Sequence, residues 1–199
     1  LRGGVYYEPL TVRVAGRSDA PMTIASYPGE QAIIDGGFRE FFSHPADTRE
    51  PVPDGVAGEF RSKKLHPNLR NVYGWFGDSM VGLHTYYHLS DLRAASELWD
   101  PSDPADPKGK SDVKPVYCGP GLWYDAETGR IHCRLAHTHL PAPDGSKHSG
   151  NYTGATDPRQ LPLVIAPFPS TPLRLDGAKH VRVHDLVLRG AGHDNVILD

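Results

Sequence analysis

The chain has 199 residues, of which 38% are hydrophobic and 23% are charged, and its formal net charge is −3. This composition lies in the ordinary range of globular proteins, so disorder is not the default expectation. The sequence has no cluster of lysines and arginines and no run of about 18 apolar residues, so we expect neither a nucleic-acid partner nor a membrane span. Its 21 glycines and 19 prolines indicate many turns and favour β structure.

Three short, largely β-branched runs lie near the N-terminus, at residues 10–14, 22–27 and 32–35. Segments rich in turn-forming residues separate them. Val12 and Ile34, in the first and third runs, are 22 positions apart. We therefore expect a repeat of this length in the N-terminal part of the chain.

Similar runs return near the C-terminus, where Leu173 and Val196 are 23 positions apart. Several short strands within a repeat of roughly 20–25 residues predict a coil that buries its inward side chains by stacking on the next coil. A leucine-rich repeat would need a fixed Leu/Asn consensus, and a β-sandwich would space its strands at roughly 8–12 residues. Spacing alone does not exclude either alternative.

Two segments resemble a known family. Residues 21–36, which include Tyr27-Pro28-Gly29-Glu30, look like an N-terminal coil of the pectate-lyase-like superfamily of right-handed parallel β-helices (the pectin-lyase fold). Residues 180–190 resemble the internal repeat of the same family. The resemblance covers about a third of the chain and implies an all-β fold, with β-helix coils at residues 1–37 and 171–199.

Residues 38–170 interrupt this rhythm, and we expect them to form one long insertion of mixed, mainly β structure. Within it the sequence predicts a hairpin over residues 121–135, a helix over residues 91–99 that begins at Ser90 or Asp91, and a strand over residues 161–165. The chain begins without Met and ends inside an apolar run, so we expect a piece of a longer protein with coils missing at both ends.

The two cysteines, Cys118 and Cys133, allow one disulfide or two free thiols. Small buried thiols are the commoner explanation of such a pair, and we expect free thiols.

Aromatic residues are numerous in the insertion and suit the apolar faces of sugar rings. The predicted substrate-binding residues are Trp75, Tyr86, Trp123 and Tyr152. The alternative is that these rings pack in the core of the insertion, as aromatic side chains mostly do.

Histidines also gather in the insertion. His137 and His139 lie on one face of an extended segment, a spacing that can ligate zinc or another transition metal. Surface or hydrogen-bonded histidines are the competing interpretation. A divalent cation such as calcium is the cofactor that this class of protein would take, because metal-neutralised uronates suit β-elimination by a lyase.

In lyases and hydrolases of the resembled superfamily, catalytic groups project from successive coils into one long groove. Here the resemblance points to the last coils, and the candidate catalytic residues are His184, Asp185, Arg189, His193 and Asp194. Outward-facing or turn positions explain the same residues equally. No lyase or hydrolase signature matches them, so no catalytic role is carried over.

Two functions follow from these observations. The first is a secreted polysaccharide lyase or glycoside hydrolase, located outside the cell, in the periplasm or at the cell surface, with polysaccharide as its partner and a monomeric state. The second is a non-catalytic surface protein, in which the coils form a stalk and the insertion binds glycan or protein. A third, weaker interpretation makes the His-rich insertion a metal site. The enzymatic function is supported mainly by analogy with the fold of the resembled superfamily.

Overall fold

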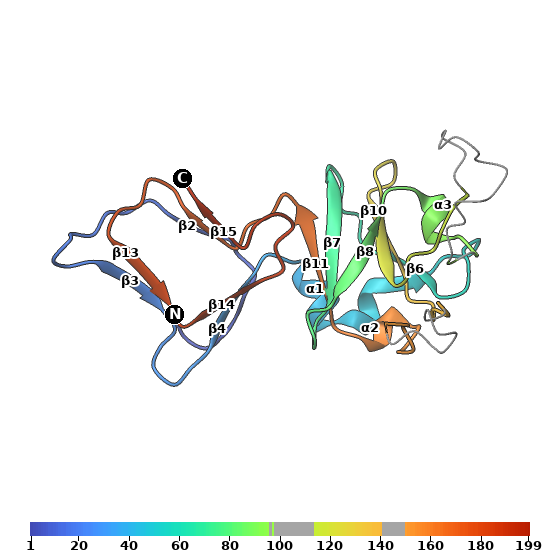
Figure 1. The fold of residues 1–199 in the computed structure, drawn as a ribbon, viewed down its shortest axis with the longest axis horizontal. Coiled ribbons are helices and arrows are strands. Elements are labelled where there is room, and N and C mark those ends of the chain that lie inside the picture. The colour runs from blue at the N-terminus through green and yellow to red at the C-terminus, as the bar shows by residue number, and fades with distance from the viewer. Residues whose placement is uncertain (96, 98–113, 141–149) are drawn as a thin grey trace.

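The computed structural model describes residues 1–95, 97, 114–140 and 150–199, and over these residues the protein is mainly β (Figure 1). Eight strands come from the two ends of the chain: β1 (Gly4–Tyr6), β2 (Leu10–Val12), β3 (Met22–Ala25), β4 (Ala32–Asp35), β12 (Leu173–Leu175), β13 (Val181–His184), β14 (Leu186–Arg189) and β15 (Val196–Leu198). We call these eight strands the coil stack.

The strands between them are β5 (Arg49–Pro51), β6 (Glu59–Ser62), β7 (Asn71–Phe76), β8 (Gly82–Tyr86), β9 (Gly121–Asp125), β10 (Arg130–Arg134) and β11 (Leu163–Phe168). They form one seven-stranded sheet, which we call the inserted sheet. The helices are α1 (Arg39–Ser43), α2 (Pro45–Thr48), α3 (Leu89–Leu92) and a 3-10 turn at Pro158–Gln160. Over the described residues, no helix has the length and apolar character needed to cross a membrane.

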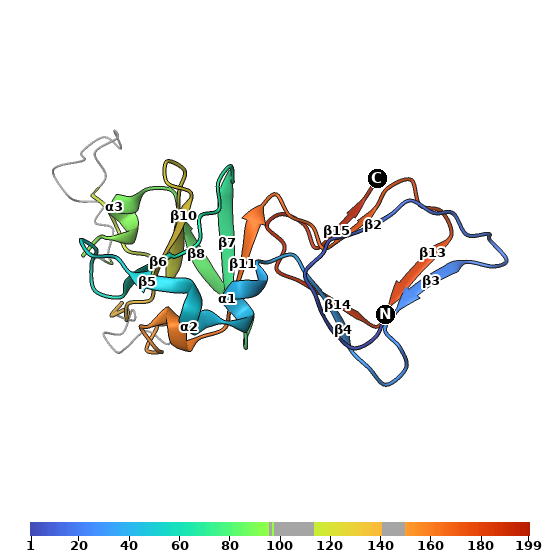
Figure 2. The ribbon, with the colours of Figure 1, turned by 180° about the vertical axis from the view of Figure 1, so that it is seen from behind.

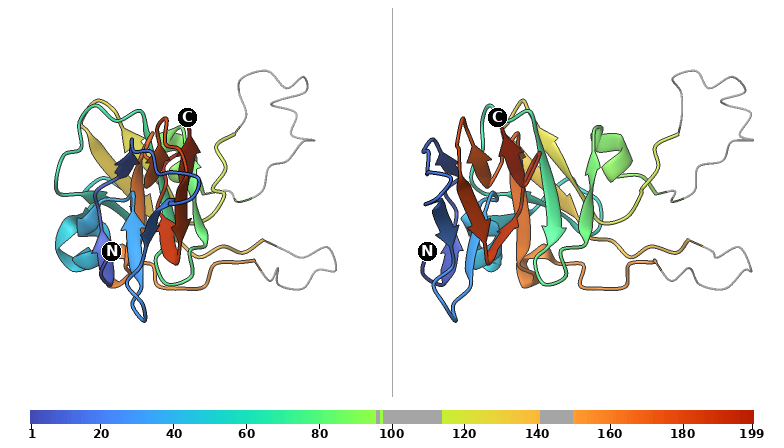
Figure 3. Two further views of the ribbon diagram at one scale, coloured as in Figure 1. Left: turned by 90° about the vertical axis from the view of Figure 1, so that its left-hand side faces the viewer. Right: turned by 60° about the vertical axis from the view of Figure 1, so that its left-hand side comes forward.

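In the coil stack, strands far apart in sequence lie side by side and parallel (Figure 3). β12 lies between β2 and β15, β13 beside β3, and β14 beside β4. Leu173 pairs with both Leu10 and Val196, which confirms the 23-residue repeat at the C-terminus. Inward positions such as Val12, Ala32 and Leu173 are buried by this stacking.

The 22-residue repeat predicted near the N-terminus is wrong. β4 stacks on β1, where Gly4 pairs with Ala32, and not on β2. Val12 and Ile34 therefore lie on different faces of the coil stack. The spacing of the apolar runs suggests successive copies of one strand, but β2, β3 and β4 form three different sides of the stack. The sequence does not distinguish the two cases, because strands on every side have the same alternating apolar pattern.

The inserted sheet leaves the coil stack at one corner. Residues 7–9 connect β1 to β2 in the first turn, whereas residues 36–172 make the corresponding connection, from β4 to β12, in the second. In the third turn, residues 190–195 connect β14 to β15. Figure 2 shows the inserted sheet beside the coil stack, with both chain ends in the stack. A sheet of seven strands thus takes the place of a short corner.

A buried ion pair lies where the inserted sheet joins the stack. Arg189, the last residue of β14, donates from Nε to Oδ2 of Asp35, the last residue of β4, at 2.7 Å. The carboxylate is 1% exposed, and its other oxygen accepts the backbone N–H of Gly37. Gly190 follows with φ of +68°, and a Cβ there would lie 2.6 Å from Oδ1 of Asp35, so the site requires glycine.

The inserted sheet has a core on each face. One face carries Val72, Leu122, Ile131 and Ile165 and is covered by α1 through Phe41. The predicted hairpin is confirmed as β9 and β10, and the predicted strand near residue 163 is present as β11. The other face carries a smaller cluster, formed by Tyr86, Leu92, Ala94 and Tyr117.

The helix predicted over residues 91–99 is wrong over its described part. α3 begins earlier, at Leu89, and ends at Leu92. Nη1 of Arg134 donates to the carbonyl oxygens of Leu92 and Ala94, at 2.8 Å each, and so takes acceptors that a continuing helix would use for its own N–H groups. Ser96 and residues 98–99 lie outside the described residues.

Arg189→Met tests the ion pair between β4 and β14. Removing one partner of a buried pair costs about 3–5 kcal/mol, because the remaining charge is left without compensation. We expect this loss in the free energy of unfolding measured with urea. Arg13→Met is the matched control, since it breaks the exposed pair with Asp176 and should cost at most about 1 kcal/mol. Equal losses in the two variants would contradict the role given to Arg189.

Candidate functional site

Two adjoining cavities follow β8 on the inserted sheet. The larger has a volume of about 830 Å³ and lies between β8, α3 and residues 114–118. The smaller has a volume of about 480 Å³ and lies between the start of β8 and residues 138, 140 and 150–152. His84 and Cys118 line both cavities, so the two form a continuous site.

Aromatic rings form the walls of this site. In the smaller cavity, Phe76 and Tyr152 stack with ring centroids 5.4 Å apart and an interplanar angle of 19°. Two backbone contacts with Thr138 hold Tyr152, because its carbonyl accepts from the Thr138 N–H and its own N–H donates to Oγ1. In the larger cavity, Tyr87 is 72% exposed. The site therefore offers flat apolar surfaces in both of its halves.

The polar groups of the larger cavity come from β8, α3 and the segment before β9. Burial lowers the pKa of His84, and the charge of Asp91 opposes this only in part. A neutral imidazole both donates and accepts hydrogen bonds, which suits a hydroxyl-rich ligand. Burial, assisted by Asp91, raises the pKa of the Cys118 thiol.

Tyr86 lines the larger cavity and is held by its hydroxyl. Its hydroxyl donates to the carbonyl of Gly119 at 2.7 Å and accepts from the N–H of Cys118 at 2.8 Å. Its ring stacks on Tyr117 at 6.0 Å. Burial raises the pKa of Tyr86, and that of Tyr117 to about 12, so both stay protonated over the ordinary pH range.

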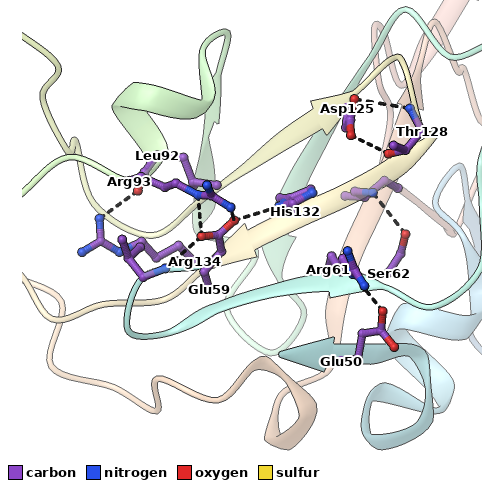
Figure 4. Close-up of polar contacts among 12 residues, drawn as sticks. Glu50, Glu59, Arg61, Ser62, Leu92, Arg93, Asp125, Thr128, His132 and Arg134 are labelled. Atoms are coloured by element: carbon purple, nitrogen blue, oxygen red, sulfur yellow. Dashed lines mark hydrogen bonds and ion pairs between the residues drawn. The ribbon is translucent and has the colours of Figure 1, made fainter. Parts of the chain in front are cut away.

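A buried carboxylate fixes the wall that α3 provides (Figure 4). The side chain of Glu59 is fully buried and accepts two hydrogen bonds from Arg93, at 2.8 and 3.0 Å. Nδ1 of His132 lies 2.8 Å from Oε1 of the same carboxylate, and the N–H of Val56 donates to Oε2 at 3.1 Å. Since Arg93 directly follows α3, this cluster ties the helix to β6 and β10.

Arg134 completes the attachment of this wall. Its guanidinium lies 4.1 Å from the ring centroid of Tyr117 and holds the carbonyls of Leu92 and Ala94. Burial acts to raise the pKa of Glu59, but hydrogen bonds from His132, Arg93 and the backbone outweigh it and lower the pKa to about 2. The carboxylate is therefore charged at any ordinary pH.

Glu59→Gln tests this cluster through its pH dependence. Because the folded-state pKa of about 2 lies below the ordinary 4.5, the stability from the carboxylate is complete above pH 4.5 and is lost as pH falls toward 2. We expect E59Q to be less stable than the wild type at pH 7 by about 3 kcal/mol, with the difference vanishing near pH 2. Chemical denaturation between pH 2 and 7 measures both curves.

The matched control for this test is Glu50→Gln. Glu50 lies on the same sheet and pairs with Arg61, but its side chain is 36% exposed. Solvent screens this pair, so E50Q should change stability far less than E59Q at pH 7. A pH-independent gap between E59Q and the wild type would contradict the electrostatic role of Glu59.

The four predicted sugar-binding residues fall at different places. Tyr152 lines the smaller cavity, and Tyr86 borders both the larger cavity and the core, with a ring that is only 2% exposed. Trp75 is half-buried on β7, on the same face as His84 by alternation along the paired strands. Trp123 packs against the cluster that contains Tyr86, with its ring 5.0 Å from that of His132.

The five candidate catalytic residues do not converge on one point. His184 and Asp185 lie at the turn before β14, whereas His193 and Asp194 lie after it, on the connection to β15. Nδ1 of each histidine contacts the neighbouring aspartate, at 2.7 and 2.6 Å. Arg189 is held in the buried pair described above, with its guanidinium 4.4 Å from the Phe42 ring centroid.

The candidate metal ligands each have a protein partner. Nε2 of His137 donates to the carbonyl of Gly154 at 2.8 Å, and Nδ1 of His139 lies 3.2 Å from Oε1 of Glu97. Within the described part of the chain, no three His, Cys, Asp or Glu side chains are grouped so as to hold a metal ion. A metal or calcium requirement therefore stays a prediction.

Both cysteines are free, Cys118 exposed and Cys133 buried. Burial raises the pKa of Cys133 to about 11.

Sequence reasoning missed the residues that position the wall of the site. Glu59, Arg93 and Arg134 are charged residues of a kind that mostly lies on the surface. They are far apart in the sequence, and no local pattern links them. Asp91 was expected to begin a helix, whereas it lines the larger cavity. The usable signals are Tyr152 and the run from His84 to His88, whose aromatic and imidazole groups line the two cavities.

Comparison with known proteins gives a fold and no family. No family model matches the chain, and no curated protein matches it. A solved structure described as "The complex structure of XylC with xylose" is similar, with a TM-score of 0.52 and 13% sequence identity. The similarity covers 92% of this chain but 28% of that one, so this chain spans about 28% of the length of its structural neighbour. At this identity the likeness concerns the fold alone.

Proposed function

We propose that the chain belongs to a carbohydrate-active protein of the right-handed parallel β-helix class, and that its inserted sheet binds polysaccharide in the site along β8. In this proposal residues 1–37 and 171–199 are coils of the β-helix and residues 38–170 are the inserted unit. The observation that carries it is the pair of adjoining cavities with the Phe76–Tyr152 stack in one and the exposed Tyr87 ring in the other. The similarity in fold to XylC supports the same class.

Binding suits this site better than glycoside hydrolysis. Hydrolases of the usual kind need two carboxyl groups separated by about 5–9.5 Å. Among the described residues that line the two cavities, Asp91 is the only carboxylate. Neutral His84 and the Asp91 carboxylate instead provide donors and acceptors for sugar hydroxyls.

The second candidate function is that of a secreted polysaccharide lyase or glycoside hydrolase with its catalytic groups on the coil stack. The observation that favours it is the pair of His–Asp contacts, one directly before β14 and one on the connection from β14 to β15. Assays on xylan and on polygalacturonate distinguish a lyase from a hydrolase. A lyase forms unsaturated products that absorb in the ultraviolet, whereas a hydrolase forms only reducing ends. Silence on both substrates favours the binding function.

Tyr87→Ala tests the platform in the larger cavity. We expect the dissociation constant for xylohexaose, measured by calorimetry, to rise about tenfold, which corresponds to about 1.4 kcal/mol of lost contact. Tyr87→Phe keeps the ring and should stay within about twofold of the wild type. Leu65→Ala, at an apolar residue that is 51% exposed and lies outside both cavities, is the control. Binding by Y87A equal to that of the wild type would refute the platform.

Alkylation of Cys118 gives an independent measure of occupancy. Cys118 lines both cavities, so a bound oligosaccharide should slow its reaction with iodoacetamide several-fold. Because the pKa of Cys118 is raised, the reaction is run at a pH well above about 8.5, the ordinary pKa of a thiol. Cys133 is buried and should stay unmodified in the folded protein, which makes it an internal control. Mass spectrometry of the two peptides follows both reactions. An unchanged rate at Cys118 under saturating xylohexaose would place the ligand elsewhere.

A further inference from the structure

A third cavity lies on the coil stack, apart from the site along β8. It has a volume of about 550 Å³ and is formed where the loop from β3 to β4 meets the turn from β13 to β14. Its lining includes Tyr27, Glu30, Gln31, His184 and Asp185. Two turns of the coil stack, separated by more than 150 positions in sequence, thus build one hollow.

The turn at His184 and Asp185 is held in a defined shape. Asp185 has φ of +57°, in the left-handed region that aspartate tolerates better than most residues. The hydroxyl of Ser26 donates to the carbonyl of Asp185 and accepts from the N–H of Ala32. Nδ1 of His184 contacts Oδ2 of Asp185 at 2.7 Å. The side-chain pair is therefore presented on a fixed backbone at the cavity.

Tyr27 supplies an apolar surface to the same cavity. It is 53% exposed, and the guanidinium of Arg2 lies 4.6 Å from its ring centroid. Arg2 is itself paired with Glu30 at 2.6 Å, and Glu30 also accepts the N–H of Gly3. These contacts hold the ring and the loop in place while more than half of the tyrosine faces solvent.

The charges at this cavity distinguish between classes of sugar. Its carboxylates are Glu30 and Asp185, and no lysine or arginine is found among its described lining residues. Arg2 and Glu30 neutralise each other, so the carboxylate at this cavity that has no arginine or lysine partner is that of Asp185. A uronate would meet like charge at Asp185, whereas the hydroxyls of a neutral sugar would find this carboxylate, the Gln31 amide and the imidazole of His184.

We propose that this cavity is a second glycan-binding site, selective for neutral sugar chains, with Tyr27 as the platform and the His184–Asp185 pair as the hydroxyl-binding group. The ligand class rests on the proposed function, but the site is independent of the one along β8. Its residues lie on the coil stack, so its occupancy does not require the inserted sheet to bind anything.

The test is a ¹H–¹⁵N NMR titration of the whole chain with xylohexaose, cellohexaose and, as the charged comparison, hexagalacturonate. We expect the neutral oligosaccharides to shift amide signals of residues 26–31 and 184–187, and hexagalacturonate to leave them unchanged. Shifts at these residues without shifts at residues 82–91 and 116–120 would support this site and overturn the proposed binding site along β8. Shifts at the β8 site alone, equal shifts with the uronate, or no shifts at all would overturn this site.

Two variants assign the binding groups. Tyr27→Ala should raise the dissociation constant at residues 184–187 about tenfold, and Asp185→Asn should raise it severalfold while keeping a residue that tolerates the left-handed backbone. Tyr87→Ala is the matched control, because it removes the platform at β8 and should leave the titration at residues 184–187 unchanged. Unchanged spectra elsewhere confirm that each variant is folded. Equal binding by Y27A and the wild type would overturn the role of Tyr27.

Discussion

The structure depends on the parallel pairing of β14 with β4, which closes the coil stack around the long excursion of the chain between them. β4 ends at Asp35, and the chain returns to the stack more than a hundred residues later. The register from Ala32–Leu186 to Asp35–Arg189 must survive that excursion. The buried ion pair at its last step fixes the register, since a slip of one residue would leave both charges buried and alone.

The two faces of the inserted sheet have different tasks. One face is filled by a large apolar cluster and gives the sheet its stability. The other face is covered only in part, by α3 and the segment around Tyr117, and the cavities along β8 lie at the border of that cover. Glu59 and Arg93 hold the cover from the side of β6, so the shape of the site depends on charges that line neither cavity.

The features predicted from sequence are those encoded locally. The turn around Gly129 specifies its hairpin, and the distance from Leu173 to Val196 specifies one turn of the stack. The short α3 was not predictable, because Arg134, which competes for its carbonyl groups, is distant in sequence. Likewise, the cavity at His184 needs Tyr27 from another turn of the coil stack. The aromatic content predicts a sugar site, but the sequence does not show which rings lie in the core, as Tyr86 does, and which are exposed, as Tyr87 is.

The corner between β4 and β12 has a consequence for how such proteins diversify. Its counterpart in the first turn has three residues, and the strands on either side keep the same pairing whether the corner is short or carries a whole sheet. The inserted sheet meets the stack around Asp35 and also through the contacts of Phe42 with Arg189 and of Phe168 with His193. A corner of this kind lets a stack of strands carry an appended sheet while its own strand pairing stays the same.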